Sequence, residues 1–275
     1  MREIAVPAGP SRAAQREWQR FTPRQRLARF AVYLAVVTAV VVSIQTVEVI
    51  PEFLVDAPEQ MRDLLQRMWP VDLAYYPEGV HAALMETLHI ATLGTILSVL
   101  LAVPVGLAAA RNVTPLPPAN YLAKLVLVAS RSVNSLVWAL LFIAVFGPGA
   151  LAGTLAIAFR SIGFVGKLFG EACEEANRGP IEALEAAGAP WLSVLRYGYW
   201  PQVKPAFWAL VLLRWDINVR ESSVLGLVGA GGIGVALNTA MNLFQWERVA
   251  TILLAIFAVV IVAEILVTQI RKRVL

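Results

Sequence analysis

Residues 87–110 read Thr-Leu-His-Ile-Ala-Thr-Leu-Gly-Thr-Ile-Leu-Ser-Val-Leu-Leu-Ala-Val-Pro-Val-Gly-Leu-Ala-Ala-Ala, a run without Asp, Glu, Lys or Arg. A helix needs ~20 mostly apolar residues to cross the hydrocarbon core of a bilayer, so this run predicts a membrane-spanning helix. A second uncharged run extends from Phe30 to Val47. It is longer than the apolar part of a signal peptide, and no small-residue cleavage site follows it, so we expect a retained helix.

The composition extends this interpretation to the whole chain. Hydrophobic residues make up 58% of the 275 residues and charged residues only 15%, whereas soluble domains have about 45–50% and about 25%. The composition therefore argues against an ordinary soluble enzyme, a disordered chain and a coiled coil. One cysteine, Cys173, and two histidines offer no metal-ligand set, and no nucleophile and base form a catalytic set. The sequence predicts an all-α membrane protein with no catalytic residue and no bound metal.

Six membrane-spanning helices are expected. Gly147-Pro148-Gly149 interrupts an uncharged stretch that runs from Ser132 to Phe159, and these residues predict two helices joined by a tight turn. The fifth expected span differs from the others because it carries several charges. The predicted spans are residues 30–50, 85–110, 121–146, 150–172, 205–224 and 249–270.

The distribution of basic residues predicts that both chain ends face the cytoplasm. Residues 1–29 hold seven arginines against two glutamates, and the C-terminal end carries Arg271, Lys272 and Arg273. Lys and Arg are retained on the cytoplasmic side, and the acidic 51–80 segment suits an outer loop. Topology thus explains the basic net charge, and nucleic acid is not an expected partner. We expect a basic cytoplasmic tail over 1–29, the first span with its outer loop over 30–80, and a core domain over 81–275.

Polar side chains within the fifth span predict a pathway for an anion. A charge at mid-bilayer costs ~2.5–3.5 kcal/mol on insertion scales and usually marks a functional position. Arg214, Asn218 and Glu221 share one helical face, and Asp216 and Arg220 lie nearly opposite. Both faces of a helix cannot be turned to lipid at such cost. One face is therefore expected to line the pathway, and the other to pack on a neighbouring helix.

Two further spans carry cations. Arg131 and Asn134 are spaced to share one face of the third span, and Arg160 and Lys167 belong to a stripe of small and cationic residues in the fourth. Arg131 and Lys167 lie near expected span ends, where long cationic side chains also reach lipid headgroups, and that alternative stays open. The predicted pathway residues are Arg131, Asn134, Arg160, Arg214, Asn218, Arg220 and Glu221.

A glycine-rich segment follows the fifth span. Residues 229–234 match GxGxxG, but a dinucleotide-binding loop requires a preceding strand within a βαβ unit, and span-like segments surround this one. We instead expect a sharp re-entrant turn on the outer side, near a gate. The predicted gate residues are Gly229, Gly231, Gly232 and Gly234.

The loop over residues 173–204 is predicted to contain a short helix on the cytoplasmic face, because Pro180 suits a helix N-terminus and Gly188 suits its end. The loop resembles the cytoplasmic loop of binding-protein-dependent ABC importers, whose pattern is E-A-A-x3-G-x9-I-x-L-P. Leu184 departs from the third position of the pattern, and the literal Glu185-Ala186-Ala187 is out of register. Gly198 and Trp200 replace the usual Ile and Leu. The matching residues are Glu182, Ala183, Gly188 and Pro201.

That resemblance implies that the short helix docks on a separate ATPase. The chain contains no GxxxxGK[ST] phosphate loop, so ATP and Mg²⁺ are expected on the partner. This chain is then a transport subunit rather than an enzyme, with no cofactor of its own.

Several segments over residues 80–275 are similar to the permease subunit of phosphonate ABC importers. The resemblance implies import of a phosphonate, phosphite or phosphate through the bacterial cytoplasmic (inner) membrane. It implies four partners: an ATPase dimer, a periplasmic or lipid-anchored binding protein, a second permease subunit (identical or different) and membrane lipid. Ser135, Arg160 and Glu221 depart from the pattern, and one acidic group has in effect moved from the third span to the fifth. The similar segments are residues 131–134, 166–168, 179–183, 201–203 and 214–220 with the glycines that follow.

Two alternatives stay open at this stage. The coupling loop does not name the cargo, so an importer for another small solute, such as methionine, has the same loop. A channel or membrane sensor that needs no ATPase is the alternative from a different class.

Overall fold

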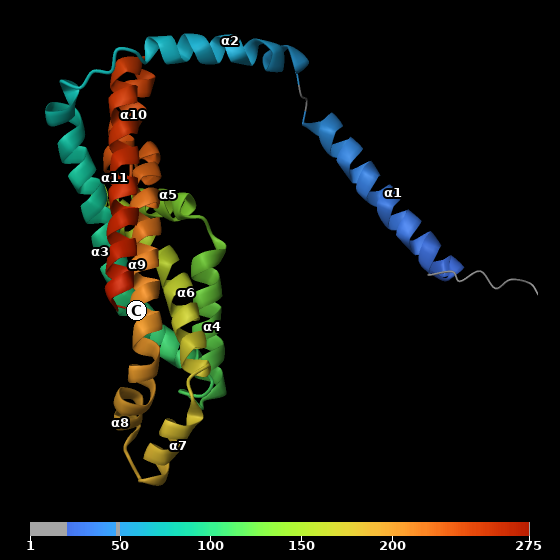
Figure 1. Ribbon diagram of the computed structural model, residues 1–275, viewed down its shortest axis with the longest axis vertical. Coiled ribbons are helices and arrows are strands. Elements are labelled where there is room, and N and C mark those ends of the chain that lie inside the picture. The colour runs from blue at the N-terminus through green and yellow to red at the C-terminus, as the bar shows by residue number, and fades with distance from the viewer. Residues whose placement is uncertain (1–20, 48–49, 275) are drawn as a thin grey trace, which may run out of the picture. The chain divides into compact units, whose positions relative to one another are not determined.

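A computed structural model describes residues 21–47 and 50–274, and within these ranges the chain is helical and contains no β-strand. The predicted all-α class is therefore confirmed (Figure 1). The helices are α1 (Pro23–Thr46), α2 (Pro51–Arg67), α3 (His81–Ala109), α4 (Pro117–Ser132), α5 (Ser135–Phe146), α6 (Ala150–Glu174), α7 (Arg178–Ala186), α8 (Trp191–Ser193), α9 (Trp200–Leu225), α10 (Ile233–Asn242) and α11 (Trp246–Val274). Short π-helical turns, η1 (Tyr76–Val80) and η2 (Val194–Tyr199), and one 3₁₀ turn, η3 (Gly226–Val228), connect some of them.

The chain divides into two units, Met1–Met61 and Arg62–Leu275. In the first, α1 begins at Pro23, where proline is favoured because its missing N–H would have no helical partner. The predicted tail over 1–29 therefore ends in helix, and residues 1–20, with most of its arginines, lie outside the described residues. The apolar side chains of α1 are exposed along its whole length, as expected of a helix whose surroundings are lipid.

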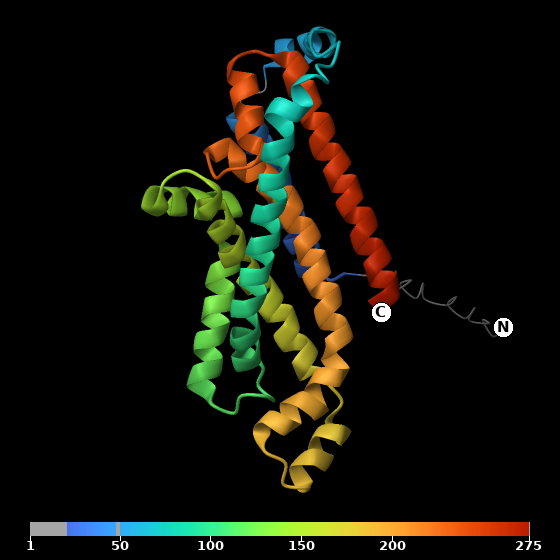
Figure 2. The same ribbon diagram turned by 90° about the vertical axis from the view of Figure 1, so that its left-hand side faces the viewer.

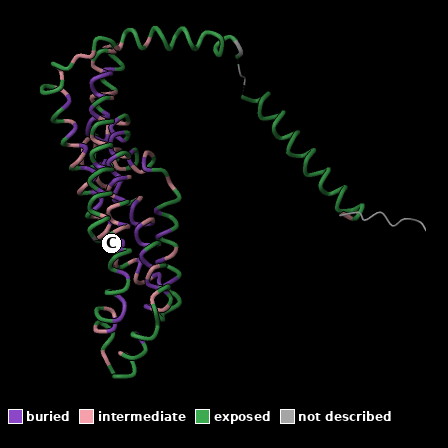
Figure 3. The backbone as a smooth tube through the Cα atoms, viewed as in Figure 1, coloured by how far each residue is buried: buried purple, intermediate pink, exposed green. Residues whose placement is uncertain are grey.

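The second unit is a bundle in which α3, α6 and α9 pack on one another, with α4 and α11 at its sides (Figure 2). Small residues bring α3 and α6 together: a methyl group on Gly106 would lie 2.7 Å from the carbonyl oxygen of Gly166. Buried residues accordingly follow these three helices (Figure 3). The bundle holds α7 and α8 at one end and α10 at the other (Figure 1).

Four helical segments are long and apolar enough to cross a bilayer: Pro23–Thr46, Tyr76–Ala109, Ala150–Glu174 and Trp246–Arg273. Counting each of two bent pairs as one span raises the number to six, so the predicted six is the upper limit of a range of four to six. The pairs are α4 with α5, and Trp191–Val228 with α10.

The third predicted span, residues 121–146, is wrong as a continuous helix. The chain bends by 94° between α4 and α5. Asn134 adopts an extended conformation there, and its side chain accepts a hydrogen bond from the backbone N–H of Leu136 at 3.2 Å. An asparagine in this position starts a new helix, because its oxygen satisfies a backbone donor that has no partner in the helix. Arg131 and Asn134 therefore do not share a helical face.

The predicted cytoplasmic loop and outer loop both contain helix. Residues 173–204 form α7, α8 and η2, and α7 begins after the N-cap Asn177, two residues before the expected start at Pro180. The 51–80 segment contains α2, which hydropathy does not identify as a span.

Candidate functional site

The most deeply buried charge of the described chain, that of Arg214, lies on the face of α9 that packs against α6. The Nε of Arg214 donates to the hydroxyl of Ser161 on α6 at 2.8 Å, and a terminal nitrogen lies 3.3 Å from Glu221 Oε2. The ring of Phe164 lies 5.4 Å from the guanidinium carbon. Because Arg214 and Glu221 are at i and i+7 on one helix, the predicted face of the fifth span brings them together.

A second arginine reaches the same carboxylate from α6. Arg160 forms an ion pair with Glu221, so that Glu221 lies between two guanidinium groups. The exposed fraction of the side chains rises from 4% for Arg214 through 18% for Glu221 to 30% for Arg160. The group therefore opens toward the surface at Arg160, and it carries one net positive charge.

Asn218 extends this group toward α3. Its amide nitrogen donates to Thr95 Oγ1 at 2.8 Å, and its amide oxygen accepts from Ser161 at 3.2 Å. Thr95 in turn donates to the carbonyl of Ala91 at 2.6 Å. We call Thr95, Arg160, Ser161, Arg214, Asn218 and Glu221 the arginine cluster. It joins α3, α6 and α9 by hydrogen bonds in the apolar interior, where an unpaired polar group would be costly.

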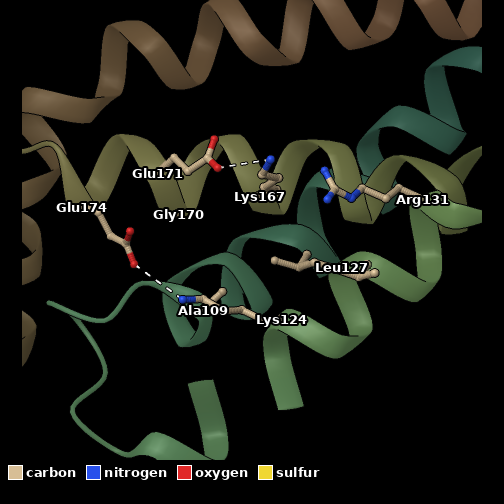
Figure 4. A pocket seen from close by; sticks show the side chains of 9 residues that line it. Ala109, Lys124, Leu127, Arg131, Lys167, Gly170, Glu171 and Glu174 are labelled. Carbon is tan, nitrogen blue, oxygen red and sulfur yellow. Dashed lines mark ion pairs between the residues drawn. The ribbon is translucent and has the colours of Figure 1, made fainter. Parts of the chain in front are cut away.

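A cavity of about 220 Å³ lies between α4 and α6, on the side of the cluster that leads toward α7. Lys167 pairs with Glu171 at 3.4 Å and Lys124 with Glu174 at 4.0 Å, as the dashed lines in Figure 4 show. Arg131 also lines the cavity, and it has no ion pair within the part of the chain that the structure describes. The lining residues are Ala109, Lys124, Leu127, Val128, Arg131, Lys167, Gly170, Glu171 and Glu174.

The structure separates the other predicted pathway residues from the cluster. Arg220 is exposed and pairs with the buried Asp216 on the opposite face of α9, as their spacing predicted. Asn134 caps α5 and is exposed. Of the seven predicted pathway residues, Arg160, Arg214, Asn218 and Glu221 come together, and Arg131 belongs to the cavity.

Sequence reasoning missed two kinds of site residue. Thr95 and Ser161 carry no signal, because small hydroxyl residues are common in membrane helices, where they bond their own backbone. The cavity residues did carry a sequence signal, namely the helical spacing of their charges. Lys124 lies seven residues before Arg131, and Glu171 four residues after Lys167, which places each pair on one helical face.

The glycine-rich segment forms the expected sharp turn. Gly229, Gly231 and Gly232 have φ angles of 89°, 84° and 75°, a region that side chains other than that of glycine disfavour. The backbone N–H of Ile233, which follows them, donates to Thr87 on α3 at 2.7 Å. Gly234 lies in the first turn of α10 instead. The role of these glycines at a gate stays a prediction.

The segment that matches the importer loop forms a compact unit at the other end of the bundle. Glu182 and Ala183 are exposed on α7, and Gly188 has a φ of 74° just after its end. Ile181 is buried, and a methyl group on Gly198 would lie 3.3 Å from it. The glycine at this departure from the pattern thus makes room for α7.

The family follows from the sequence of this bundle. A model of the family described as the binding-protein-dependent transport system inner membrane component matches residues 102–275. The chain belongs to this family. The resemblance seen in the α7 loop is therefore confirmed, and the chain is a permease component of the ABC transporter type.

Curated relatives include permeases for phosphorus compounds. The chain is 40% identical over 203 residues to the phosphite transport system permease protein PtxC of Stutzerimonas stutzeri, covering 74% of each chain. It is 38% identical over 234 residues to the phosphate-import permease protein PhnE of Mycolicibacterium smegmatis, which is 85% of this chain and 44% of that one. The chain therefore spans less than half the length of the mycobacterial relative.

The fold is that of solved ABC importer permeases. An inward-facing structure of the MetNI methionine ABC transporter matches with a TM-score of 0.62 at 20% identity, covering 72% of this chain and 96% of that chain. At this identity the likeness establishes the architecture alone.

The cluster predicts unequal costs for removing two arginines of this permease. Replacing Arg214 with Met should lower the free energy of unfolding by about 3 kcal/mol, because it removes a partner from a buried ion pair. Arg131→Met, at an exposed residue, should change it by less than about 0.5 kcal/mol. Thermal unfolding of the purified full-length protein in detergent measures both, and equal losses of stability would contradict the buried network.

Proposed function

We propose that the protein is the permease subunit of an ATP-driven importer that moves a phosphonate, phosphite or phosphate across the bacterial cytoplasmic membrane. The observation that carries the proposal is the series of cations along α4, α6 and α9. Arg160 and Arg214 meet within the bundle, and Arg131, Lys124 and Lys167 surround a cavity nearer α7. The names of the phosphite and phosphate relatives support the same cargo.

The chemistry of the cluster suits a phosphorus oxyanion. A guanidinium group presents paired N–H donors that can hold two oxygens of such an anion at once. Ser161 accepts a hydrogen bond from Arg214 and donates one to Asn218, which fixes the orientation of the Arg214 side chain. Binding of the anion therefore costs less side-chain entropy at this arginine. Arg160 is partly exposed and is the side chain that an anion in the pathway would meet first.

Glu221 acts in this proposal as an internal substitute for the cargo. Its carboxylate already pairs with one terminal nitrogen of each arginine, and an arriving oxyanion must compete for these two positions. The two arginines remain partly neutralised when no cargo is bound, which lowers the cost of burying them. Competition of this kind weakens binding, and weak binding favours release to the far side.

Energy for transport is proposed to come from a separate ATPase that docks on α7. Glu182 and Ala183 are exposed there, and Gly188 ends the helix. This chain then needs no ATP or Mg²⁺ of its own. A binding protein delivers the cargo, a second permease completes the pathway, and both chain ends face the cytoplasm.

Uptake by cells tests the proposed cargo. A deletion strain and its complemented parent should be compared for uptake of labelled methylphosphonate, phosphite, phosphate and methionine under phosphorus starvation. We expect deletion to abolish uptake of at least one phosphorus compound, because the cluster and the cavity are cationic. Loss of methionine uptake alone would instead identify a methionine importer with the same fold.

Glu221 should control how tightly the anion binds. Glu221→Gln frees both arginines, so the methylphosphonate concentration that gives half the maximal thermal shift of the full-length protein should fall about tenfold, or ~1.4 kcal/mol. The maximal uptake rate should fall as well, because release becomes slow. Asp216→Asn is the matched control, since it removes the other buried carboxylate of α9, on the opposite face. Unchanged binding and full transport in Glu221→Gln would contradict the substitute role.

Docking of the ATPase should depend on the α7 residues that match the importer pattern and not on every exposed charge of that helix. Glu182→Lys and Gly188→Val should abolish co-purification of the ATPase, by reversing a charge and by placing a branched side chain at a positive φ. Glu185→Lys changes a second exposed glutamate of the same helix and should leave the complex intact. Pull-down with the tagged permease measures all three. Retention of the ATPase by Glu182→Lys and Gly188→Val would contradict docking on α7. A wild-type permease that captures no ATPase would instead favour a channel or sensor that works alone.

A further inference from the structure

The helix α2 lies outside the predicted transport pathway, and it is sharply amphipathic. At 3.6 residues per turn, its apolar side chains fall on one side and its charged side chains on the other, with Val55 as the exception. Phe53 and Leu54 are 66% and 67% exposed, and Leu65 is 59% exposed. The apolar side consists of Phe53, Leu54, Ala57, Met61, Leu64 and Leu65.

The chain on both sides of α2 leads directly to membrane-spanning helices. Only residues 47–50 separate α2 from the end of α1, a distance of at most about 17 Å for extended chain. On the other side, Asp72 is fixed to the beginning of α11: its carbonyl accepts from Thr251 at 2.8 Å, and its carboxylate lies 3.6 Å from Arg248. Each end of α2 is therefore joined by a short segment to the end of a helix that is long and apolar enough to span a bilayer.

Aromatic residues mark that level on the second unit. Trp69 follows α2 and is 75% exposed, and Trp246 and Phe244 lie at the start of α11, within reach of each other's rings. Tryptophan gathers at the boundary between hydrocarbon and water, because one part of its ring is apolar and its N–H is polar. These aromatic residues are typical of a membrane–water interface on the side where the chain leaves α2.

We propose that α2 lies flat on the outer surface of the cytoplasmic membrane, with its apolar side inserted among the lipids. An interfacial helix is distinguished by its division into an apolar and a charged face. α2 has that division, and its charges prevent it from spanning. On the charged side, Arg67 and Asp63 pair at 2.7 Å while more than half exposed, as residues facing water do.

The charge of α2 specifies the kind of lipid. It carries Glu52, Asp56, Glu59 and Asp63 against Arg62 and Arg67, and is therefore net negative. Interfacial helices that are rich in Lys and Arg gain affinity from anionic headgroups. α2 has no such gain, so its insertion depends on apolar burial and takes place in zwitterionic lipid.

Site-directed fluorescence tests the proposal on the full-length protein. The single cysteine, Cys173, is buried in α6, and Cys173→Ser gives a background for one engineered cysteine at a time. Leu54→Cys, Leu65→Cys and Phe53→Cys place an environment-sensitive dye on the apolar side. Glu59→Cys and Gln66→Cys place it on the charged side of the same helix as matched controls.

In vesicles of phosphatidylcholine we expect a blue shift for the three apolar positions, with several-fold stronger quenching by nitroxide-labelled lipid than by aqueous iodide. The two control positions should show the reverse preference. Iodide quenching that is equal on both sides would overturn the proposal. So would apolar positions shielded from both quenchers, because a protein would then cover this face. A requirement for anionic lipid would overturn the stated mode of insertion. These outcomes do not depend on the cargo.

Discussion

The carboxylate of Glu221 between Arg160 and Arg214 is the interaction on which the core of the bundle depends. Three ionised groups lie there among apolar helices, where an isolated charge would be very unfavourable. They are tolerated because each has a partner from another helix or another turn, and because Ser161 accepts from the Nε of Arg214 and donates in turn to Asn218. The positions of α3, α6 and α9 are thereby fixed by polar geometry as well as by close packing of small residues.

This arrangement also connects the departures from the phosphonate permease pattern. Arg160 and Glu221, which the pattern does not lead one to expect, form an ion pair with each other across α6 and α9. Ser135 is the third departure, and it stands where the pattern has a glutamate, so the carboxylate absent from the third span is present in the fifth as Glu221. The ion pair of Glu221 with Arg160 thus joins the acidic departure to the basic one.

Sequence patterns predicted what depends on spacing within one helix. The face of Arg214, Asn218 and Glu221 followed from intervals of four and three residues, and the opposite pair of Asp216 and Arg220 from an interval of four. The bend at Asn134 was not predicted, although Ser132, Asn134 and Ser135 interrupt the apolar run there. Val133 and Asn134 adopt extended backbone conformations and the side chain of Asn134 caps α5, features that hydropathy averaged over a span does not register. Contacts between helices, such as that of Thr95 with Asn218, depend on packing that no local pattern encodes.

The hydrogen bonds of Gln202 give α9 a mechanical role. Gln202 accepts from the backbone N–H of Asn177, at the start of α7, at 2.8 Å, and donates to the carbonyl of Gly198 at 2.7 Å. α9 then continues as one helix of 26 residues past Arg214 and Glu221. At 1.5 Å per residue, Arg214 lies about 18 Å along this rod from Gln202. A displacement imposed on α7 is thus passed along α9, through Pro205, to Arg214 and Glu221, and it reaches Arg160 on α6 only through the ion pair with Glu221.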